Sequence, residues 1–422
     1  MKTFLRATFE QFRTLNRPAR LFLLALFLDG LLFSGWNLFF NLYILKAGHS
    51  RDFLGLINAA PSISALLLGV PMGLLSDRIG RKRAMIIGFT LSNFGVLGLS
   101  LARSETVMLV MALFWGATGQ LFVLSQAPFM MQASDDRTRD VLFSLSMGVV
   151  PLASTFGNLL SGYLPGLFSR FLGAPDSPLA YQAVLLTSVT ASFAVLIPLA
   201  FVQEPKAAER RAASDPLRPK DPSLWTALAR PLTLKLALPN LLIGFGAAML
   251  VPYFNIFFAE RYAMSDASLG LLFSIGALLI GVGSLVGPRL VGNLGGKVRT
   301  VILAEAVSLI FLLAIGFSPW PWLAMAGYLV RGALMNMIAP LFDAYALEQS
   351  SVTEHGMVTS VRNVAMNVGW AVGPYVSGLV QQRWGFNPLF VNTAVLYGLA
   401  IGITWLFFDR KAPLNRAAAP GG

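Results

Sequence analysis

The chain has 422 residues, of which 55% are hydrophobic and only 12% are charged, and its mean hydropathy is +0.66. A soluble domain carries about 25% charged residues, so a soluble protein of this length would lack the charges that cover its surface. The net charge of +12 does not indicate nucleic-acid binding, because the basic residues gather in short segments between apolar blocks. The chain has no cysteine, which excludes disulfides and thiolate metal ligands.

Twelve apolar blocks follow one another, with lengths close to the roughly 20 residues that a membrane-spanning helix needs. They lie near 21–45, 53–76, 84–102, 106–131, 141–166, 180–202, 233–258, 267–291, 300–317, 320–345, 356–381 and 386–408. We therefore predict an all-α integral membrane protein with twelve transmembrane helices.

The segments around these blocks divide the chain into five parts. Residues 1–20 are predicted to form an amphipathic segment on the cytoplasmic surface, with a frayed tail as the alternative. A polar linker at 203–232, broken by prolines, separates an N-terminal six-helix bundle from a C-terminal one. The two bundles are predicted at 21–202 and 233–408, and a cytoplasmic tail at 409–422.

Lysine and arginine predict the orientation of these helices. With both termini inside, 24 of the 32 basic residues lie on the inner side, six lie in outer loops, and Arg331 and Arg362 lie within spans. Cytoplasmic loops carry the excess of lysine and arginine in membrane proteins. We therefore predict a multi-pass protein of a bacterial-type inner membrane, with both termini and the linker in the cytoplasm.

The two sets of six blocks share four short matches at offsets of 212 to 216 residues. FFNLY at 39–43 matches YFNIFF at 253–258, and Leu-Gly at 54–55 matches Leu-Gly at 269–270. Ala-Pro at 127–128 matches 339–340, and Ser-Gly at 161–162 matches 377–378. Four matches in the same order indicate a duplication, which predicts parallel repeats with a substrate site between them.

Residues 73–82 read GLLSDRIGRK, between the second and third spans. This segment resembles the major facilitator signature of the same loop, Gly-x-Leu-(small)-Asp-Arg-x-Gly-Arg-(Lys/Arg). The motif residues are Gly73, Asp77, Arg78, Gly80, Arg81 and Lys82. The resemblance implies two pseudo-symmetric six-helix bundles that transport a small molecule by alternating access.

The motif also implies a latch that closes the cytoplasmic side. Gly73 is expected to let helices approach closely, and Gly80 to permit a turn with positive φ. The resemblance implies that Asp77 lies at the amino end of the eleventh span, near 356–359, where the helix dipole favours a negative charge. Arg78 and Arg81 are then expected to pair with acids, for which Asp343, Asp135 and Asp136 are candidates.

Three departures from family patterns limit the assignment. The second copy of the loop, near 288–299, has Gly292 and Asn293 in place of Asp77 and Arg78, so only the first latch is expected to carry charge. Drug–proton antiporters of the family often carry a Gly-Pro pattern in the fifth span, which is missing here. Their span-4 arginine is missing too, since 114–120 read FWGATGQ.

Ionisable residues within the spans are candidates for function, because a charge in lipid is costly. Asp29 is predicted to couple proton flow to substrate; a hydrogen-bonded or cavity-wetted carboxylate is the alternative. Arg331 could hold an anionic substrate or neutralise Asp29. Arg362 could join the cytoplasmic gate with Asp343 or Glu348. Glu305, near the cytoplasmic end of the ninth span, is expected to extend toward water.

Amide and aromatic side chains form a second group of candidates, predicted to line a central cavity. They are Asn37, Asn41, Gln120, Gln126, Asn255, Asn363, Asn367 and Trp370. Such a cavity would suit a polar or amphipathic organic molecule. The alternative role for the asparagines is hydrogen bonding between helices.

The sequence therefore predicts a monomeric secondary active transporter rather than an enzyme, since no metal-binding or nucleotide-binding motif occurs. Without a Gly-x-x-x-x-Gly-Lys-(Ser/Thr) loop, energy is expected to come from an ion gradient. Proton-coupled export or antiport of a small organic molecule is the first hypothesis. The alternative is an uptake permease, a proton symporter or uniporter, for a sugar or an organic anion. We expect no enzyme activity and no cofactor, and we expect membrane lipid and protons as partners.

Overall fold

A computed structural model describes residues 11–173, 177–203, 231–290, 294–351 and 354–409, except for the side chains of 284–290. Helices dominate these ranges, and no β-strand occurs in them. Several predicted features lie wholly or partly outside the described residues. They are residues 1–10 of the amphipathic segment, most of the linker, nearly all of the tail, and Gly292 and Asn293.

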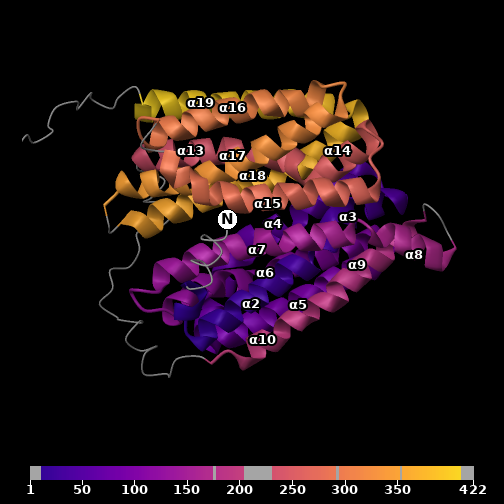
Figure 1. Cartoon of the computed structure of the whole chain (residues 1–422), viewed down its shortest axis with the longest axis horizontal. Coiled ribbons are helices and arrows are strands. Elements are labelled where there is room, and N and C mark those ends of the chain that lie inside the picture. The colour runs from indigo at the N-terminus through magenta and orange to yellow at the C-terminus, as the bar shows by residue number, and fades with distance from the viewer. Residues whose placement is uncertain (1–10, 174–176, 204–230, 291–293, 352–353, 410–422) are drawn as a thin grey trace, which may run out of the picture. The chain divides into compact units, whose positions relative to one another are not determined.

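Within the described residues, the first set of predicted spans corresponds to nine α-helices, labelled in Figure 1. They are α2 (Arg17–Leu32), α3 (Ser34–Lys46), α4 (Arg51–Ile79), α5 (Arg81–Leu101), α6 (Glu105–Gln132), α7 (Arg139–Ser161), α8 (Leu164–Leu172), α9 (Pro178–Ser192) and α10 (Leu196–Phe201). The first span consists of α2 and α3, which meet at Phe33.

In the described part of the chain, the second set corresponds to seven α-helices. They are α13 (Pro231–Leu250), α14 (Phe254–Arg261), α15 (Asp266–Leu290), α16 (Lys297–Phe317), α17 (Pro321–Glu348), α18 (His355–Trp384) and α19 (Asn387–Thr404). The seventh span consists of α13 and α14, joined by the short 3₁₀ segment Val251–Tyr253. The first span of each set is therefore interrupted partway along its length.

Eleven helical segments of the described chain are long and apolar enough to cross a membrane. The remaining predicted span, the eleventh in chain order, is α18, which has 30 residues and is thus long enough. It is missing from the eleven because polar residues such as Arg362, Asn363 and Asn367 lower its mean hydropathy. Polar side chains within a span face protein or a water-filled cavity rather than lipid.

Local sequence signals explain where several helices begin and end. The side chain of Asn16 caps α2 by accepting a hydrogen bond from the backbone N–H of Ala19 (2.9 Å). Ser50 caps α4 in the same way through the N–H of Phe53. Gly80 ends α4 with a φ of 95°, and the next helix begins at Arg81. A side chain is disfavoured at that φ, so glycine makes this tight connection possible.

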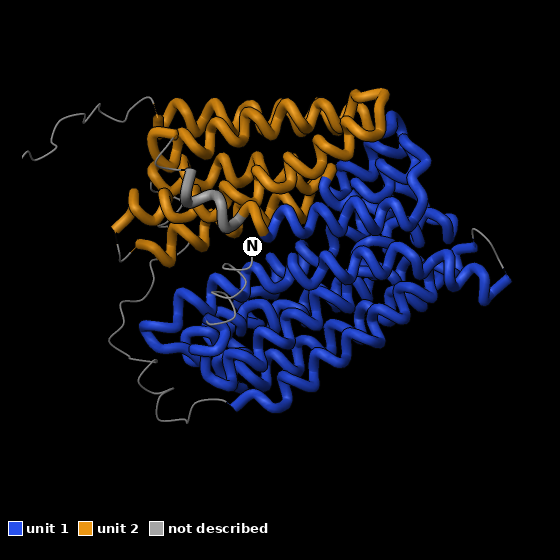
Figure 2. The backbone as a smooth tube through the Cα atoms, in the orientation of Figure 1, with its two compact units in different colours: residues 1–220, 251–281, 374–385 blue, residues 221–250, 282–373, 386–422 orange. Residues whose placement is uncertain are grey.

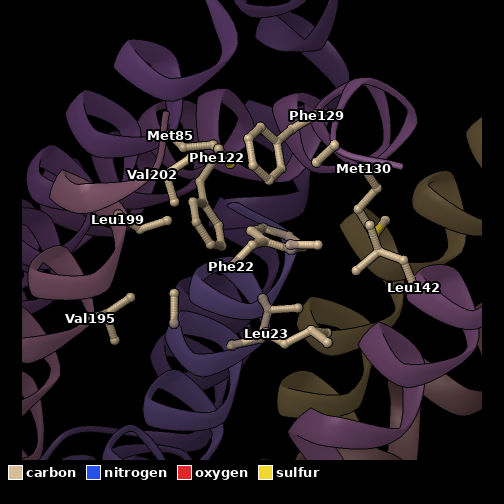
Figure 3. Packing of buried hydrophobic residues seen from close by; sticks show 14 of the residues in the cluster. Phe22, Leu23, Met85, Phe122, Phe129, Met130, Leu142, Val195, Leu199 and Val202 are labelled. Atoms are coloured by element: carbon tan, nitrogen blue, oxygen red, sulfur yellow. The ribbon is translucent and has the colours of Figure 1, made fainter. Parts of the chain in front are cut away.

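A hydrophobic cluster joins α2, α5, α6, α7 and α10 (Figure 3). The rings of Phe22 and Phe129 lie at its centre, 5.2 Å apart and tilted by 52°. Met85 and Phe122 pack around them, and all four side chains are buried. This cluster fixes α2 relative to α6, the two helices that carry Asp29 and Gln126.

The described chain forms two compact units (Figure 2). Unit 1 contains 1–220, 251–281 and 374–385, and unit 2 contains 221–250, 282–373 and 386–422. The division therefore does not fall at the linker alone. Helix α14, the first part of α15 and the last part of α18 pack with the first set of spans, although the sequence places them in the second.

Candidate functional site

A cavity of about 370 Å³ lies within unit 1, between α2, α6 and α7. Helix α2 contributes Asp29, α6 contributes Phe122 and Gln126, and α7 contributes Ser146 and Met147. Two residues that the sequence singled out separately, Asp29 and Gln126, thus line the same cavity.

Asp29 is the acidic residue of this cavity. It lies in the last turn of α2, one turn before the interruption at Phe33, and it is partly exposed. Within the described part of the chain its carboxyl group has no hydrogen-bond or ion-pair partner. A carboxyl group inside a membrane protein without a protein partner is a site for a proton or for a cationic group.

Apart from Ser146, the rest of the lining is apolar. Phe122 and Phe143 contribute aromatic rings, and Met130 and Met147 contribute thioethers. Methionine adapts its shape to irregular partners, and aromatic faces attract cations. This lining can therefore accept an amphipathic organic molecule, while Gln126 can donate or accept a hydrogen bond.

Asn41 and Asn255 are buried and bond to each other's helices. The Asn41 amide donates to the carbonyl oxygen of Pro252 (2.5 Å), and the Asn255 amide donates to that of Leu38 (2.7 Å). These contacts are those of the alternative role, hydrogen bonding between helices. Asn37, one turn before Asn41, is exposed.

The predicted polar face of α18 is present. Asn363 and Asn367 are exposed, Trp370 is half-buried, and the Asn367 amide donates to the carbonyl oxygen of Asn363 (2.9 Å). Gln120 is half-buried on α6 and is not among the residues that line the cavity near Asp29.

Arg331 is buried in unit 2 and is held by Tyr397. Its guanidinium donates to the Tyr397 hydroxyl (2.9 Å) and lies 5.5 Å from the centre of that ring. Tyr397 was not predicted as a partner of Arg331, because a single tyrosine in an apolar span has no local signal that names its contact. Glu305 is also buried, because α16 packs against α17 and α19, so the expectation that it extends to water is wrong.

Arg362 forms an ion pair with Asp343, one of the two acids that the sequence analysis considered as its partner. The two groups lie 2.8 Å apart, and the guanidinium stacks 5.0 Å from the ring centre of Phe342. Glu348, the other acid considered for Arg362, pairs with Lys297 instead.

The motif between α4 and α5 has its own internal contacts. Arg81 pairs with Asp77 and also donates to the hydroxyl of Ser76 (2.9 Å). Lys82 donates to the carbonyl oxygen of Ala200 (2.6 Å), and Arg78 is exposed. The acid that pairs with Arg81 is therefore one of the motif itself rather than Asp343, Asp135 or Asp136.

The two motif glycines differ. Gly80 has the positive φ that the sequence predicted. A Cβ added to Gly73 would lie 3.8 Å from the nearest side-chain atom, on Leu124, which is an ordinary contact. The expectation that Gly73 is needed for close helix packing is therefore wrong for this conformation.

Comparisons with known proteins agree with the helical architecture. A family model for the Major Facilitator Superfamily matches residues 22–304 and 236–422. The multidrug resistance protein MdtG of Dickeya zeae (strain Ech586) is 25% identical over 406 residues, which cover 92% of this chain and 94% of MdtG. The chromaffin granule amine transporter of Homo sapiens is 26% identical over 363 residues, covering 81% of this chain and 63% of that protein.

Among solved structures, a bacterial homologue of the human lysosomal transporter Spinster, in an inward-facing and occupied conformation, superposes with a TM-score of 0.75. It is 14% identical and covers 92% of this chain and 95% of its own. Long apolar helices in two repeated sets, with an internal cavity, define a polytopic membrane transporter. The chain belongs to the Major Facilitator Superfamily. Members of this family carry small molecules across membranes, and the relatives named here are transporters rather than enzymes.

Proposed function

We propose that this transporter exports a small amphipathic organic cation in exchange for protons, by alternating access. The observation that carries the proposal is the carboxyl group of Asp29 in a cavity of aromatic, methionine and amide side chains. The names of two relatives, a multidrug resistance protein and an amine transporter, support a substrate of this kind.

One carboxyl group gives a simple basis for exchange. A protonated Asp29 is neutral and has no electrostatic attraction for a cation, whereas the ionised group attracts one. Substrate and proton would then occupy the site in turn. Proton entry from one side would release the cation there, and cation binding on the other side would release the proton.

Orientation and assembly complete the proposal. The distribution of lysine and arginine supports cytoplasmic termini in a bacterial-type inner membrane. We also propose that the chain acts as a monomer. An organic anion is less well supported as substrate, since the guanidinium of Arg331 is buried against Tyr397.

The proposal can be tested in proteoliposomes with an imposed pH gradient and ethidium as a fluorescent cationic probe. Wild-type protein should accumulate ethidium against its gradient, and collapse of the pH gradient should abolish accumulation. Asp29→Asn should abolish it as well, while Asp140→Asn, an exposed acid at the start of α7, should not. Accumulation by Asp29→Asn equal to that of the wild type would contradict the role of Asp29.

A further inference from the structure

Residues of three of the four repeated sequence pairs lie within unit 1, whose segments Figure 2 colours blue. The pairs are Asn41 with Asn255, Gly55 with Gly270, and Gly162 with Gly378. We call these six residues the glycine–asparagine seam. It joins α3, α4 and α7 of the first set to α14, α15 and α18 of the second.

Each of the two asparagines donates a hydrogen bond to a backbone carbonyl in the other's segment. Asn41 donates to the carbonyl oxygen of Pro252, and Asn255 donates to that of Leu38. Leu38 and Pro252 each lie three residues before the asparagine of their own segment. The two bonds are therefore reciprocal, and repeat-related residues make equivalent contacts in opposite directions.

The carbonyl oxygens of both amides are also satisfied. Asn41 accepts from the side chain of Asn58 (3.1 Å), and Asn255 accepts from the backbone N–H of Ile256 (2.9 Å). The exposed fraction of Asn41 is 4% and that of Asn255 is 2%. These amides are therefore removed from water at the seam, and their bonds to protein replace bonds to water.

The glycines bring helix backbones into contact on either side of the asparagines. Gly55 of α4 meets Gly378 of α18, where an added Cβ would lie 3.0 Å from the Gly378 Cα. Gly270 of α15 meets Gly162, the residue that follows α7, and a Cβ added to Gly270 would lie 2.6 Å from the Gly162 Cα. In the repeat, Gly55 corresponds to Gly270, and Gly162 corresponds to Gly378. The contact of Gly55 with Gly378 is therefore equivalent to the contact of Gly270 with Gly162.

A polar contact lies next to this seam. Arg51, at the start of α4, pairs with Glu260 of α14 (2.5 Å), and its backbone N–H donates to the side chain of Gln382 on α18 (3.1 Å). Segments from both halves of the chain are thus joined by hydrogen bonds, an ion pair and backbone contacts at the same end of the spans.

The chemistry of these contacts suits an interface that opens and closes. Exchange of an amide hydrogen bond for one with water changes the free energy little, whereas separation of interlocked apolar side chains exposes surface at a large cost. Glycine pairs also leave no interlocking side chains at the points of closest approach. Separation of the seam would therefore hydrate the two asparagines without a large penalty.

We propose that the glycine–asparagine seam is a reversible latch, and that the reciprocal Asn41–Asn255 bonds set how often the predicted outer side of the transporter is closed. This inference rests on alternating access, as the proposed function does, but not on Asp29, on protons or on the identity of the substrate. Its test therefore measures access from outside rather than transport.

The chain has no cysteine, so a single introduced cysteine reports access without background. Asn37 suits this purpose because it is exposed and lies one turn from Asn41 on the same helix face. Intact cells that express Asn37→Cys would be treated with a membrane-impermeant maleimide, and the rate of labelling would be measured. Inverted membrane vesicles would give the rate from the cytoplasmic side.

Removal of either asparagine should favour the open outer side. In the Asn37→Cys background, Asn41→Ala and Asn255→Ala should each raise labelling in intact cells by about fivefold, the effect of about one net hydrogen bond. Labelling in inverted vesicles should fall. Because the two bonds act together, the double variant should show less than the product of the single effects.

A matched control is Asn336→Ala, since the Asn336 amide donates to the carbonyl oxygen of Gly332 in its own helix (2.9 Å). It should leave labelling unchanged. Gly162→Ala provides an independent route, because its methyl group would prevent the approach of Gly270. It should raise outside labelling even if an asparagine variant fails to fold.

Size-exclusion chromatography would identify folded variants before labelling is compared. Unchanged or slower labelling in folded Asn41→Ala and Gly162→Ala would overturn the latch. An Asp29→Asn protein that no longer transports but still shows the Asn41→Ala effect would separate the latch from the proposed exchange of cation and proton.

Discussion

Arg362 and Asp343 form an ion pair with unequal environments. The side chain of Arg362 is 5% exposed, whereas that of Asp343 is 65% exposed. The buried guanidinium thus reaches a carboxylate that solvent also reaches. Asp343→Ala should lower the free energy of unfolding by about 1–3 kcal/mol, because it leaves a buried charge without its acidic partner.

Thermal unfolding in detergent would measure this effect. Glu348→Gln is the matched control, since its pair with Lys297 lies on the surface and should contribute less than about 1 kcal/mol. Equal shifts in the two variants would show that burial of Arg362 does not govern the strength of its pair.

The two glycines of the motif should respond differently to a methyl group. Gly80→Ala should destabilise the protein by about 1–3 kcal/mol, because a φ of 95° with a ψ of 149° is a conformation that alanine rarely adopts. Gly73→Ala should have little effect on stability, since its Cβ would make only an ordinary contact. Melting temperatures of both variants would test this, and a larger loss in Gly73→Ala would contradict it.

The hydroxyl of Tyr397 should matter more for stability than that of an exposed tyrosine. Tyr397→Phe removes the acceptor of a hydrogen bond from buried Arg331 and should cost about 1–3 kcal/mol. Tyr375 is exposed and serves as the control, so Tyr375→Phe should be close to neutral. Chemical or thermal unfolding of the two variants gives the comparison.

Asp135 should contribute to the acid sensitivity of the fold. The Thr138 side chain and the backbone N–H groups of Thr138 and Arg137 donate to its carboxylate and hold its pKa below the usual value of 3.8. Because the folded pKa is lowered, this contribution is present above the unfolded pKa and is lost as pH falls through the folded one.

The stability difference between wild type and Asp135→Asn should therefore shrink as pH is lowered from about 6 to about 3. Melting temperatures across this range would measure it, with Asp136→Asn, a neighbouring exposed acid, as the control. A difference that stays constant with pH would show that ionisation of Asp135 does not stabilise the loop.

The polar face of α18 should be accessible to water. Asn367→Cys should react readily with a water-soluble maleimide in purified protein, because a thiol reacts as its thiolate and ionises in water. Leu399→Cys, on an exposed apolar position of α19, should react slowly where detergent or lipid covers it. Similar rates at the two positions would place both in the same environment.

The sequence predicted the features that depend on local chemistry or on repetition. The periodic apolar blocks predicted the transmembrane spans. Gly80 predicted the turn between α4 and α5, because few residues other than glycine tolerate a positive φ. The duplication gave the pairing of Asn41 with Asn255 as repeat mates, since it preserved residues in equivalent positions.

Contacts between distant segments were harder to predict. The pairing of Gly55 with Gly378 crosses the repeats, and no pattern along one helix reports which neighbour it will meet. The hydrogen bond from Arg331 to Tyr397 was missed for the same reason, because an isolated aromatic residue in an apolar span does not indicate which residue it will contact. For Gly73 the prediction failed in the opposite way. Its motif position predicted close helix packing, but a motif position does not specify how tightly the residue packs in every conformation.

The reciprocal bonds of Asn41 and Asn255 have the form of an isologous dimer contact, in which residue i of one subunit meets residue j of the other, and j meets i. Two identical six-helix chains around a two-fold axis would form this contact with one asparagine in each copy. In such a homodimer, any substitution would alter both bonds at once. Fusion into one chain removes that constraint, and Asn41 accepts from Asn58 whereas Asn255 accepts from its own backbone neighbour. The strengths of the two hydrogen bonds can therefore change independently during evolution.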